Sequence, residues 1–266
     1  MDFTGKVALI TGGGNGLGRA AAEGFATRGA KVVLVDRDQA SGEATAGILR
    51  QRGAEAKFIA ADVTRSADVQ AYVKATLDAY GAIDCFYNNA GIEGAVAPTA
   101  EYDEEMFDRV MAVNVKGVFL GLRHVLPVML QQKRGAVVNT ASVAGLVASP
   151  SMPAYVASKH AVIGLTKTAA GEVARSGVRV NAVCPGPIDT RMIHSLESML
   201  NPDDPSAVGT RYQSSIPLGR YGTAEEIANL VLFLCSDLAS NITGAQYVAD
   251  GGRTATGGAV TANRVR

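Results

Sequence analysis

The chain has 266 residues, with 25 basic and 25 acidic side chains and therefore no formal net charge. This length allows one large buried core without disulfides or structural metal, and the charge balance argues against a nucleic-acid or membrane-surface protein. No apolar run approaches the roughly 18–20 residues that cross a bilayer, and the first residues lack the regions of a secretory signal, so we expect a soluble, cytoplasmic protein with no membrane or nucleic-acid partner.

Short runs rich in β-branched residues alternate with longer helical patterns along the chain. Strands are predicted at residues 7–11, 32–36, 56–61, 83–87, 136–140, 178–183 and 246–249. Helices are predicted at residues 16–28, 39–51, 67–80, 104–131 and 153–175, and a capping box at Thr223 and Glu226 opens another that ends near Cys235. This alternation predicts an α/β fold, a single-domain, Rossmann-like, doubly wound parallel sheet of about seven strands with helices on both faces.

No linker or change of composition divides the chain, so we expect one domain over residues 1–252, followed by a tail, 253–266, that frays. Residues 191–221 show the least regular pattern, and such a segment inside a compact domain is usually a functional loop or lid. Its apolar residues fit an amphipathic lid over an apolar substrate and, equally, a lid helix packed on its own core: Met192, Ile193, Leu196, Met199 and Leu200.

The cysteines and histidines show no metal-ligand spacing, so no metal site is predicted. The three cysteines lie far apart in apolar stretches and are expected to be reduced core thiols: Cys85, Cys184 and Cys235. The three histidines fit no ligand cluster: His124, His160 and His194. His194 and Glu93 stay open as substrate contacts, although both are ordinary residues for exposed positions.

Glycine is the unusual count, at 30 of 266 residues or about 11%, against an ordinary usage of about 7%. The first predicted strand runs into a turn that opens a helix and contains the candidate cofactor-binding residues Gly12, Asn15, Gly16, Leu17 and Gly18. Glycines there let the backbone approach a pyrophosphate, which the free N–H groups and dipole of the helix N-terminus attract. The spacing differs from the common G-x-G-x-x-G pattern, and a tight turn with close helix packing is the alternative.

Asp36 ends the second predicted strand, 18 residues after Gly18. A carboxylate at this position can accept both hydroxyls of an adenosine ribose and repels the 2′-phosphate of NADP, so it favours NAD. Arg37 follows and would favour that phosphate, which keeps NADP as the less favoured cofactor. Asp36 as a helix N-cap is the structural alternative.

The third and fourth predicted strands also end in candidate cofactor-binding residues: Asp62 and Val63 after the third, and Asn89, Ala90 and Gly91 after the fourth. Ligands bind at the carboxyl ends of strands in open α/β sheets. Ordinary turn chemistry of aspartate, asparagine and glycine explains the same residues.

Tyr155 and Lys159 lie four residues apart and so share one face of the helix predicted at 153–175. Ser142 follows the fifth predicted strand, and Asn114 lies in the long helix before it. A tyrosine with a pKa near 10 is scarcely ionised at neutral pH, but a neighbouring ammonium and a positive nicotinamide would lower that pKa. Tyr155 would then be a general acid/base.

Together these motifs resemble the short-chain dehydrogenase/reductase family, in family order from about Lys6 to Gly252. The resemblance implies that Tyr155 exchanges the substrate hydroxyl proton, that Ser142 holds the substrate oxygen, and that Lys159 binds the nicotinamide ribose. It also implies that Asn114 holds a water in a proton relay. The resemblance further implies that four residues of one motif contact the nicotinamide: Pro185, Gly186, Ile188 and Thr190. Many relatives have two serines where this chain has Ala141 and Ser142, and the second is the catalytic one.

The resulting hypothesis is an NAD-dependent oxidoreductase that interconverts a small secondary alcohol, cyclic or apolar, and its ketone. Residues 1–252 would be its dinucleotide-binding catalytic domain. A reductase of 3-oxoacyl thioesters has the same motifs and is the alternative, and a non-catalytic NAD-binding sensor is a remote one. Family resemblance further implies a homotetramer.

Overall fold

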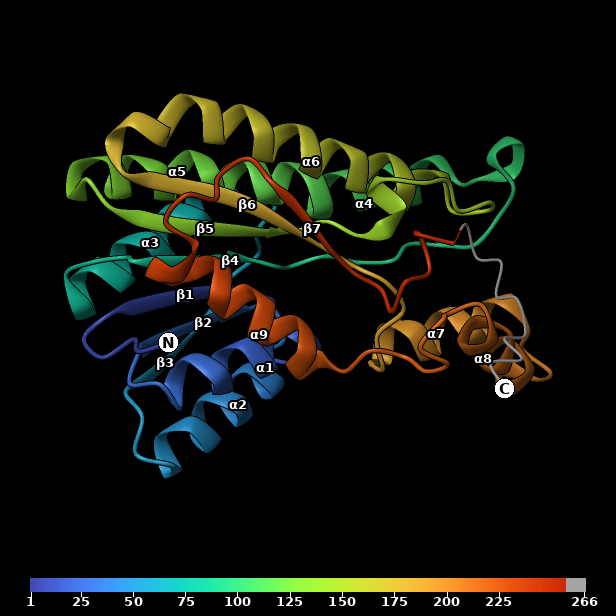
Figure 1. Cartoon of the computed structure of the whole chain (residues 1–266), viewed down its shortest axis with the longest axis horizontal. Coiled ribbons are helices and arrows are strands. Elements are labelled where there is room, and N and C mark those ends of the chain that lie inside the picture. The colour runs from blue at the N-terminus through green and yellow to red at the C-terminus, as the bar shows by residue number, and fades with distance from the viewer. Residues whose placement is uncertain (257–266) are drawn as a thin grey trace, which may run out of the picture.

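The computed structural model describes residues 1–256, and these form a seven-stranded, wholly parallel sheet with the strand order β3-β2-β1-β4-β5-β6-β7 (Figure 1). The strands are β1 (Val7–Thr11), β2 (Lys31–Asp36), β3 (Ala56–Ala60), β4 (Cys85–Asn88), β5 (Gly135–Thr140), β6 (Val178–Pro185) and β7 (Gln246–Ala249). The chain order reverses between β1 and β4, which is the switch point where open α/β sheets bind ligands. The predicted doubly wound fold is confirmed.

Helices cover both faces of the sheet and create two apolar cores (Figure 1). On one face lie α3 (Ser66–Tyr80), α4 (Glu104–Met111), α5 (Gly117–Gln132) and α6 (Pro153–Val173). On the other lie α1 (Gly16–Ala26), α2 (Gln39–Gln51) and α9 (Ala224–Cys235). The predicted capping box of α9 forms, with Thr223 accepting from the Glu226 N–H and the Glu226 carboxylate accepting from that of Thr223. All three cysteines are buried free thiols, as expected.

The helix predicted at 104–131 is interrupted. A π-helical segment, Ala112–Lys116, separates α4 from α5 and contains the buried Asn114. Such bulges are frequent at functional sites because they redirect side chains. Among the described residues, Glu104–Gln132 is also long and apolar enough to cross a membrane by length and composition, since one window of 18 residues in it has a mean hydropathy of 1.3. The expectation of no such run was therefore wrong; its apolar side chains pack into the core against α3 and α6.

Residues 191–221 are more regular than expected. They contain α7 (Arg191–Leu200) and α8 (Pro205–Ser214), and Asp204 caps α8 by accepting from the Ala207 N–H. Ile193 and Leu196 of α7 pack in a third, smaller core, so the amphipathic pattern marks a helix and not an irregular loop. The sequence missed α8 because Pro205 looked like a breaker, although proline is well tolerated at the first position of a helix.

The expected fraying of the tail is wrong for its first residues. The Asp250 carboxylate accepts from the N–H and hydroxyl of Thr254 at 2.8 and 2.6 Å and from the N–H of Gly252 at 2.9 Å. Residues 257–266 of the predicted tail lie outside the described residues.

Candidate active site

A cleft of about 860 Å³ runs along the carboxyl ends of the central strands and reaches α7 and α8. It brings together most residues selected from the sequence, namely Gly12, Asn15, Gly16, Leu17, Asp36, Arg37, Asp62, Val63, Asn89, Ala90, Gly91, Ser142, Tyr155, Lys159, Pro185, Gly186, Ile188 and Thr190. Gly18 and Asn114 lie beneath its surface instead. Sequence reasoning missed Ile92 and Thr140, which adjoin predicted motifs, and Tyr212 and Arg253, for which the sequence holds no signal.

The turn between β1 and α1 can accommodate only glycine at three positions. Gly12 and Gly16 have φ values of +65° and +49°, a backbone conformation that side chains with a Cβ rarely adopt. A Cβ on Gly18 would overlap the carbonyl oxygen of Gly12. The first N–H groups of α1 therefore reach the cleft, and this is a cradle that fits a pyrophosphate.

Asp36 is not a helix N-cap. Asp38 caps α2 by accepting from the Ser41 N–H, whereas the Asp36 carboxylate accepts from the N–H groups of Gly14 and Asp38, each at 3.0 Å. These bonds hold the carboxylate at the cleft wall. Each of its oxygens keeps a further lone pair, so both can accept from a ligand hydroxyl.

Asn89 ties the ends of three neighbouring segments together. Its amide donates to the carbonyl oxygens of Thr11 and Gly12 at 3.1 and 3.3 Å, and it accepts from the Thr140 hydroxyl at 3.0 Å. Asn89 is thus a structural link between β1, β4 and β5 at the floor of the cleft. Close packing also requires glycine at position 186, since a Cβ there would lie 2.6 Å from Asp250 Cβ.

Tyr155, Lys159 and Ser142 converge where the cleft meets the end of β5. The buried Lys159 donates to the Thr140 carbonyl at 2.8 Å, and its Nζ lies 5.5 Å from the centroid of the Tyr155 ring. Ser142 lies two residues after the end of β5, and its hydroxyl accepts from the Ala144 N–H at 3.1 Å. The i, i+4 spacing on α6 therefore aims both Tyr155 and Lys159 at one point.

Asn114 lies just behind this group. Its amide donates to the Ile92 carbonyl at 2.9 Å and to the Ser158 hydroxyl at 3.0 Å, and it accepts from the Ile92 N–H at 2.8 Å. A Cβ at Gly91 would lie 3.3 Å from Asn114 Oδ1 and 3.7 Å from Lys159 Nζ. Gly91 therefore leaves open space between the amide and the ammonium.

The protein's own groups shift the two ionisable side chains in opposite directions. Burial raises the pKa of Tyr155 to about 12, with a partly compensating hydrogen bond from Ser142. Burial lowers the pKa of Lys159 to about 8. The lowering of the Tyr155 pKa that was expected is not seen with residues 1–256 alone, because loss of hydration and the negative charge of Glu93 raise this pKa more than the Ser142 hydrogen bond lowers it.

A protein-family model described as Enoyl-(Acyl carrier protein) reductase matches residues 12–254. Levodione reductase from Leifsonia aquatica is 44% identical over 255 residues, which cover 95% of this chain and 96% of that protein. The chain belongs to the short-chain dehydrogenase/reductase family. The resemblance read from its motifs is confirmed.

Solved structures of this family share the fold over nearly the whole chain. The crystal structure of levodione reductase has a TM-score of 0.94 at 45% identity and covers 95% of this chain and 99% of its own. NAD⁺-bound xylitol dehydrogenase has a TM-score of 0.90 at 37% identity, with 95% and 100% covered. A 3-ketoacyl-(acyl-carrier-protein) reductase from Brucella melitensis, complexed with NADH, has 0.87 at 37% identity, with 95% and 100% covered. The chain is therefore an oxidoreductase by family, and these neighbours support a nicotinamide cofactor.

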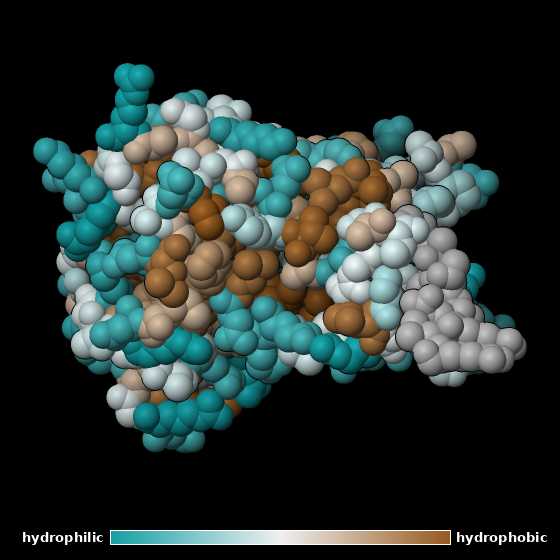
Figure 2. All heavy atoms as spheres, viewed as in Figure 1, coloured by the Kyte–Doolittle hydropathy of each residue, from teal (hydrophilic) through white to brown (hydrophobic). Residues whose placement is uncertain are grey.

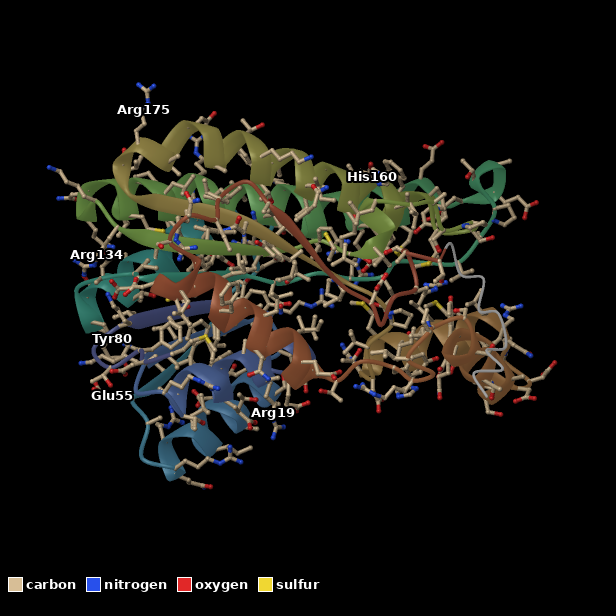
Figure 3. The ribbon with its side chains drawn as sticks, in the orientation of Figure 1. Arg19, Glu55, Tyr80, Arg134, His160 and Arg175 are labelled. Carbon is tan, nitrogen blue, oxygen red and sulfur yellow. The ribbon has the colours of Figure 1, made fainter. Side chains whose placement is uncertain are left out.

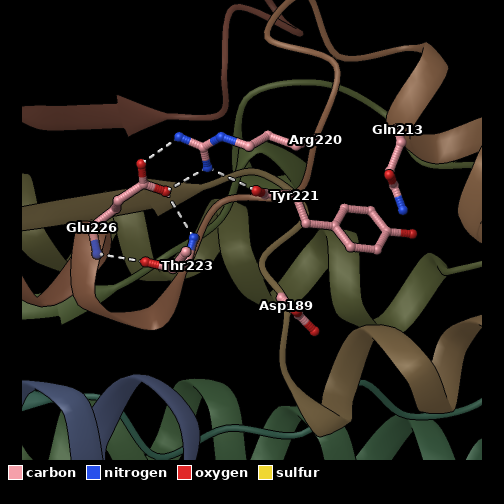
Figure 4. A pocket seen from close by; sticks show the side chains of 6 residues that line it. All are labelled: Asp189, Gln213, Arg220, Tyr221, Thr223 and Glu226. Atoms are coloured by element: carbon pink, nitrogen blue, oxygen red, sulfur yellow. Dashed lines mark hydrogen bonds and ion pairs between the residues drawn. The ribbon is translucent and has the colours of Figure 1, made fainter.

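In this short-chain dehydrogenase/reductase, a network of side chains fixes α7 to the segment that follows α8. His194 bonds Asp189 at 2.9 Å and Glu197 at 2.8 Å, and the buried Glu197 accepts from the Tyr221 hydroxyl. Tyr221 and Asp189 lie on the wall of a second hollow, of about 440 Å³, beside the Arg220–Glu226 ion pair (Figure 4). The opposite side of α7 lines the cleft through Met192 and Ile193, so the network sets the position of that wall. His194 and Glu93, left open as substrate contacts, are not among the lining residues of the cleft.

We expect His194→Ala to lower the melting temperature in a pH-dependent way. The bonds to Glu197 and Asp189 raise the pKa of His194, so its contribution is fully present below its ordinary pKa of about 6.5 and is lost as pH rises through the raised value. Because the side chain is 56% exposed, the difference from wild type should be small, about 1–3 °C at pH 6, and should shrink towards pH 9. Thermal unfolding of both proteins across this range measures it. A difference that stays constant with pH would contradict the ion-pair assignment.

Proposed function

We propose that the chain is an NAD-dependent dehydrogenase that interconverts a small secondary alcohol, cyclic or apolar, and its ketone. The observation that carries the proposal is the meeting of Tyr155, Lys159 and Ser142 in the same cleft as the glycine turn of α1. Binding alcohol and cofactor side by side makes a bimolecular step effectively unimolecular. The apolar side chains at the α7 end of the cleft suit a largely apolar substrate.

Tyr155 is the general acid/base of this proposal. Its hydroxyl takes the proton of the alcohol in oxidation and returns it to the ketone oxygen in reduction. Ser142 donates a hydrogen bond to the same oxygen and stabilises its developing charge. The Lys159 ammonium holds the nicotinamide ribose and favours the phenolate of Tyr155, and Asn114 holds a water in the space that Gly91 leaves open. Bound NAD would accept the hydride from the carbinol carbon.

The remaining candidate residues would hold the cofactor along the cleft. The turn from Gly12 to Gly18, with Asn15, Gly16 and Leu17, would bind the pyrophosphate. The adenosine would lie against the ends of β2 and β3: Asp36, Arg37, Asp62 and Val63. The nicotinamide half would lie along the ends of β4 and β6: Asn89, Ala90, Gly91, Pro185, Gly186, Ile188 and Thr190.

We expect Asp36→Ala to lower the preference for NAD over NADP by about 10- to 100-fold in kcat/KM. The variant loses an acceptor for the ribose hydroxyls and the charge that repels a 2′-phosphate. Asp36→Asn keeps the acceptor for Gly14 N–H and removes the charge, so it separates repulsion from loss of the turn's hydrogen bonds. Steady-state kinetics with both cofactors measure the ratio. A tenfold preference of the wild type for NADP would refute the ribose argument.

Reduction of 3-oxoacyl thioesters is the second candidate, favoured by the likeness to the NADH-complexed 3-ketoacyl-(acyl-carrier-protein) reductase. A panel of secondary alcohols, ketones and one 3-oxoacyl thioester, each tested with NAD(H) and NADP(H), decides between the two by absorbance of the reduced nicotinamide. Turnover of the thioester alone would overturn the alcohol proposal. Cofactor binding without any turnover would favour the sensor.

We further propose a cytoplasmic homotetramer whose lid comprises residues 191–221. Two surfaces support self-association. Large apolar side chains are exposed on α4 and α5, where Phe107 is 38% and Phe119 43% exposed, and on the edge strand β7, where Val248 is 43% exposed. Figure 2 shows apolar residues gathered on the face that carries this edge. Light scattering coupled to size-exclusion chromatography would measure the assembly.

A further inference from the structure

We infer that Arg253 is a specificity-determining residue that selects substrates carrying a carboxylate remote from the reacting carbon. This inference rests on the proposed function and adds a substrate class to it. Arg253 and the next residue, Thr254, line the same cleft as Tyr155. Neither the glycine turn nor the Tyr155 motif accounts for it.

A rigid turn fixes the position of Arg253. Gly251 and Gly252 have φ values of +65° and +89°, and the Asp250 carboxylate accepts from the Gly252 N–H on one side of Arg253 and the Thr254 N–H on the other. The Leu218 N–H donates to the Gly251 carbonyl at 3.2 Å, which ties the turn to the segment after α8. The guanidinium is therefore held at a set place relative to α8.

Its surroundings are those of a binding site and not of a surface ion pair. The guanidinium carbon lies over the Tyr212 ring of α8, 5.4 Å from the ring centroid, which is a cation–π contact. Tyr212 packs on the third core, which also receives Tyr155. One apolar cluster thus supports both the proton-transferring hydroxyl and the platform under Arg253.

The charge of Arg253 is uncompensated in the described part of the chain. No acidic side chain lies within ion-pair distance there, and its guanidinium makes no hydrogen bond with residues 1–256. The acids that line the cleft among the described residues, Asp36, Asp38 and Asp62, follow β2 and β3 at its other end.

Exposure separates Arg253 from the other arginines of the cleft. Of the four that line it in the described residues, Arg37, Arg109 and Arg191 are exposed and Arg253 is half-buried. Partial burial strengthens a charge-assisted bond, and the planar guanidinium matches a carboxylate with two parallel hydrogen bonds. The geometry therefore points to a cyclic or branched ketone with a carboxylate facing α8.

The test uses a matched series in which only the distal group changes: cyclohexanone, cyclohexane-1,4-dione and 4-oxocyclohexane-1-carboxylate. Wild-type kcat/KM should be highest for the carboxylate. Arg253→Met keeps the length of the stem and should lower kcat/KM for the carboxylate by about 10- to 100-fold while changing that for cyclohexanone less than about twofold. Arg253→Lys should recover part of the loss. Arg175→Met changes an exposed residue just after α6, remote from α7 and α8 (Figure 3); it is the control and should leave all three values unchanged.

An equal loss on all three ketones would overturn the inference and assign Arg253 a structural role, as would a wild type that prefers cyclohexanone. Turnover of cyclohexanone in that case still supports the proposed function. Calorimetric measurement of cyclohexanecarboxylate binding in the presence of NADH tests the inference separately from the proposed function. Binding to wild type but not to Arg253→Met supports the inference even if no ketone of the series is reduced, and equal binding to both proteins overturns it.

Discussion

Tyr155→Phe is expected to lower kcat/KM for the preferred alcohol by at least about 10²- to 10⁴-fold, the usual contribution of a positioned acid/base. The ring remains and only the hydroxyl is lost, so the apolar packing that supports it is kept. Cofactor affinity should therefore change by less than about twofold, because the cradle at the α1 turn is untouched. Steady-state kinetics measure kcat/KM, and titration with NAD measures the cofactor affinity.

Tyr80→Phe is the matched control, since it removes a phenol hydroxyl at the end of α3, away from the cleft (Figure 3). It should leave kcat/KM unchanged. Normal activity in Tyr155→Phe would refute the assigned base, and loss of NAD binding together with activity would indicate a collapsed cleft.

The raised pKa of Tyr155, about 12, also gives the direction of the pH dependence. Below that value the hydroxyl stays protonated, which is the form that donates a proton to a ketone. Oxidation needs the phenolate, so its kcat/KM should rise with pH over about pH 6 to 9, whereas that of reduction should not. The charge of the cofactor and of Lys159 would shift this profile to lower pH without changing its sign.

The second large effect is expected at Gly18. Gly18→Ala places a methyl group into the carbonyl oxygen of Gly12, a backbone atom that cannot move without displacing the turn. Overpacking of this kind costs about 1–3 kcal/mol. Displacement of the pyrophosphate cradle should weaken NAD binding by at least about tenfold, which calorimetry measures directly.

Gly47→Ala is the control for Gly18→Ala. Gly47 lies inside α2, and a Cβ there meets no described atom within 4 Å. Alanine is the better helix former by about 1 kcal/mol, so this variant should be more stable than wild type and bind NAD normally. Similar behaviour of the two variants would refute the close approach of Gly18 to Gly12.

The positions of the strands, and of the polar residues at their carboxyl ends, can be predicted from the local sequence pattern. Runs such as Val7–Thr11 are apolar throughout because both faces of a parallel sheet are covered. Since every strand of such a sheet points the same way, residues that end different strands meet at one edge. Asp36 and Ser142 could therefore be placed at the same edge of the sheet without knowledge of the packing.

Other features escaped prediction because they depend on contacts between distant segments. The π-helical segment at Asn114 resembles the helix around it in sequence, and it is set by hydrogen bonds to Ile92 and Ser158. The pKa of Tyr155 was expected to fall because of its spacing to Lys159, but spacing carries no information on how much hydration the phenol hydroxyl loses in the folded protein.

The sequence by itself thus determined the fold class, the family and the residues that line most of the cleft, because hydrophobic periodicity and glycine turns act over a few residues. Only the tertiary structure decided which residues surround the substrate at the end of the cleft near α7 and α8. Arg253 meets Tyr212 there because the turn after β7 packs on the segment after α8, and α7 is fixed by the bond between Glu197 and Tyr221. Such pairings depend on how packed elements approach one another in space, which no local pattern encodes.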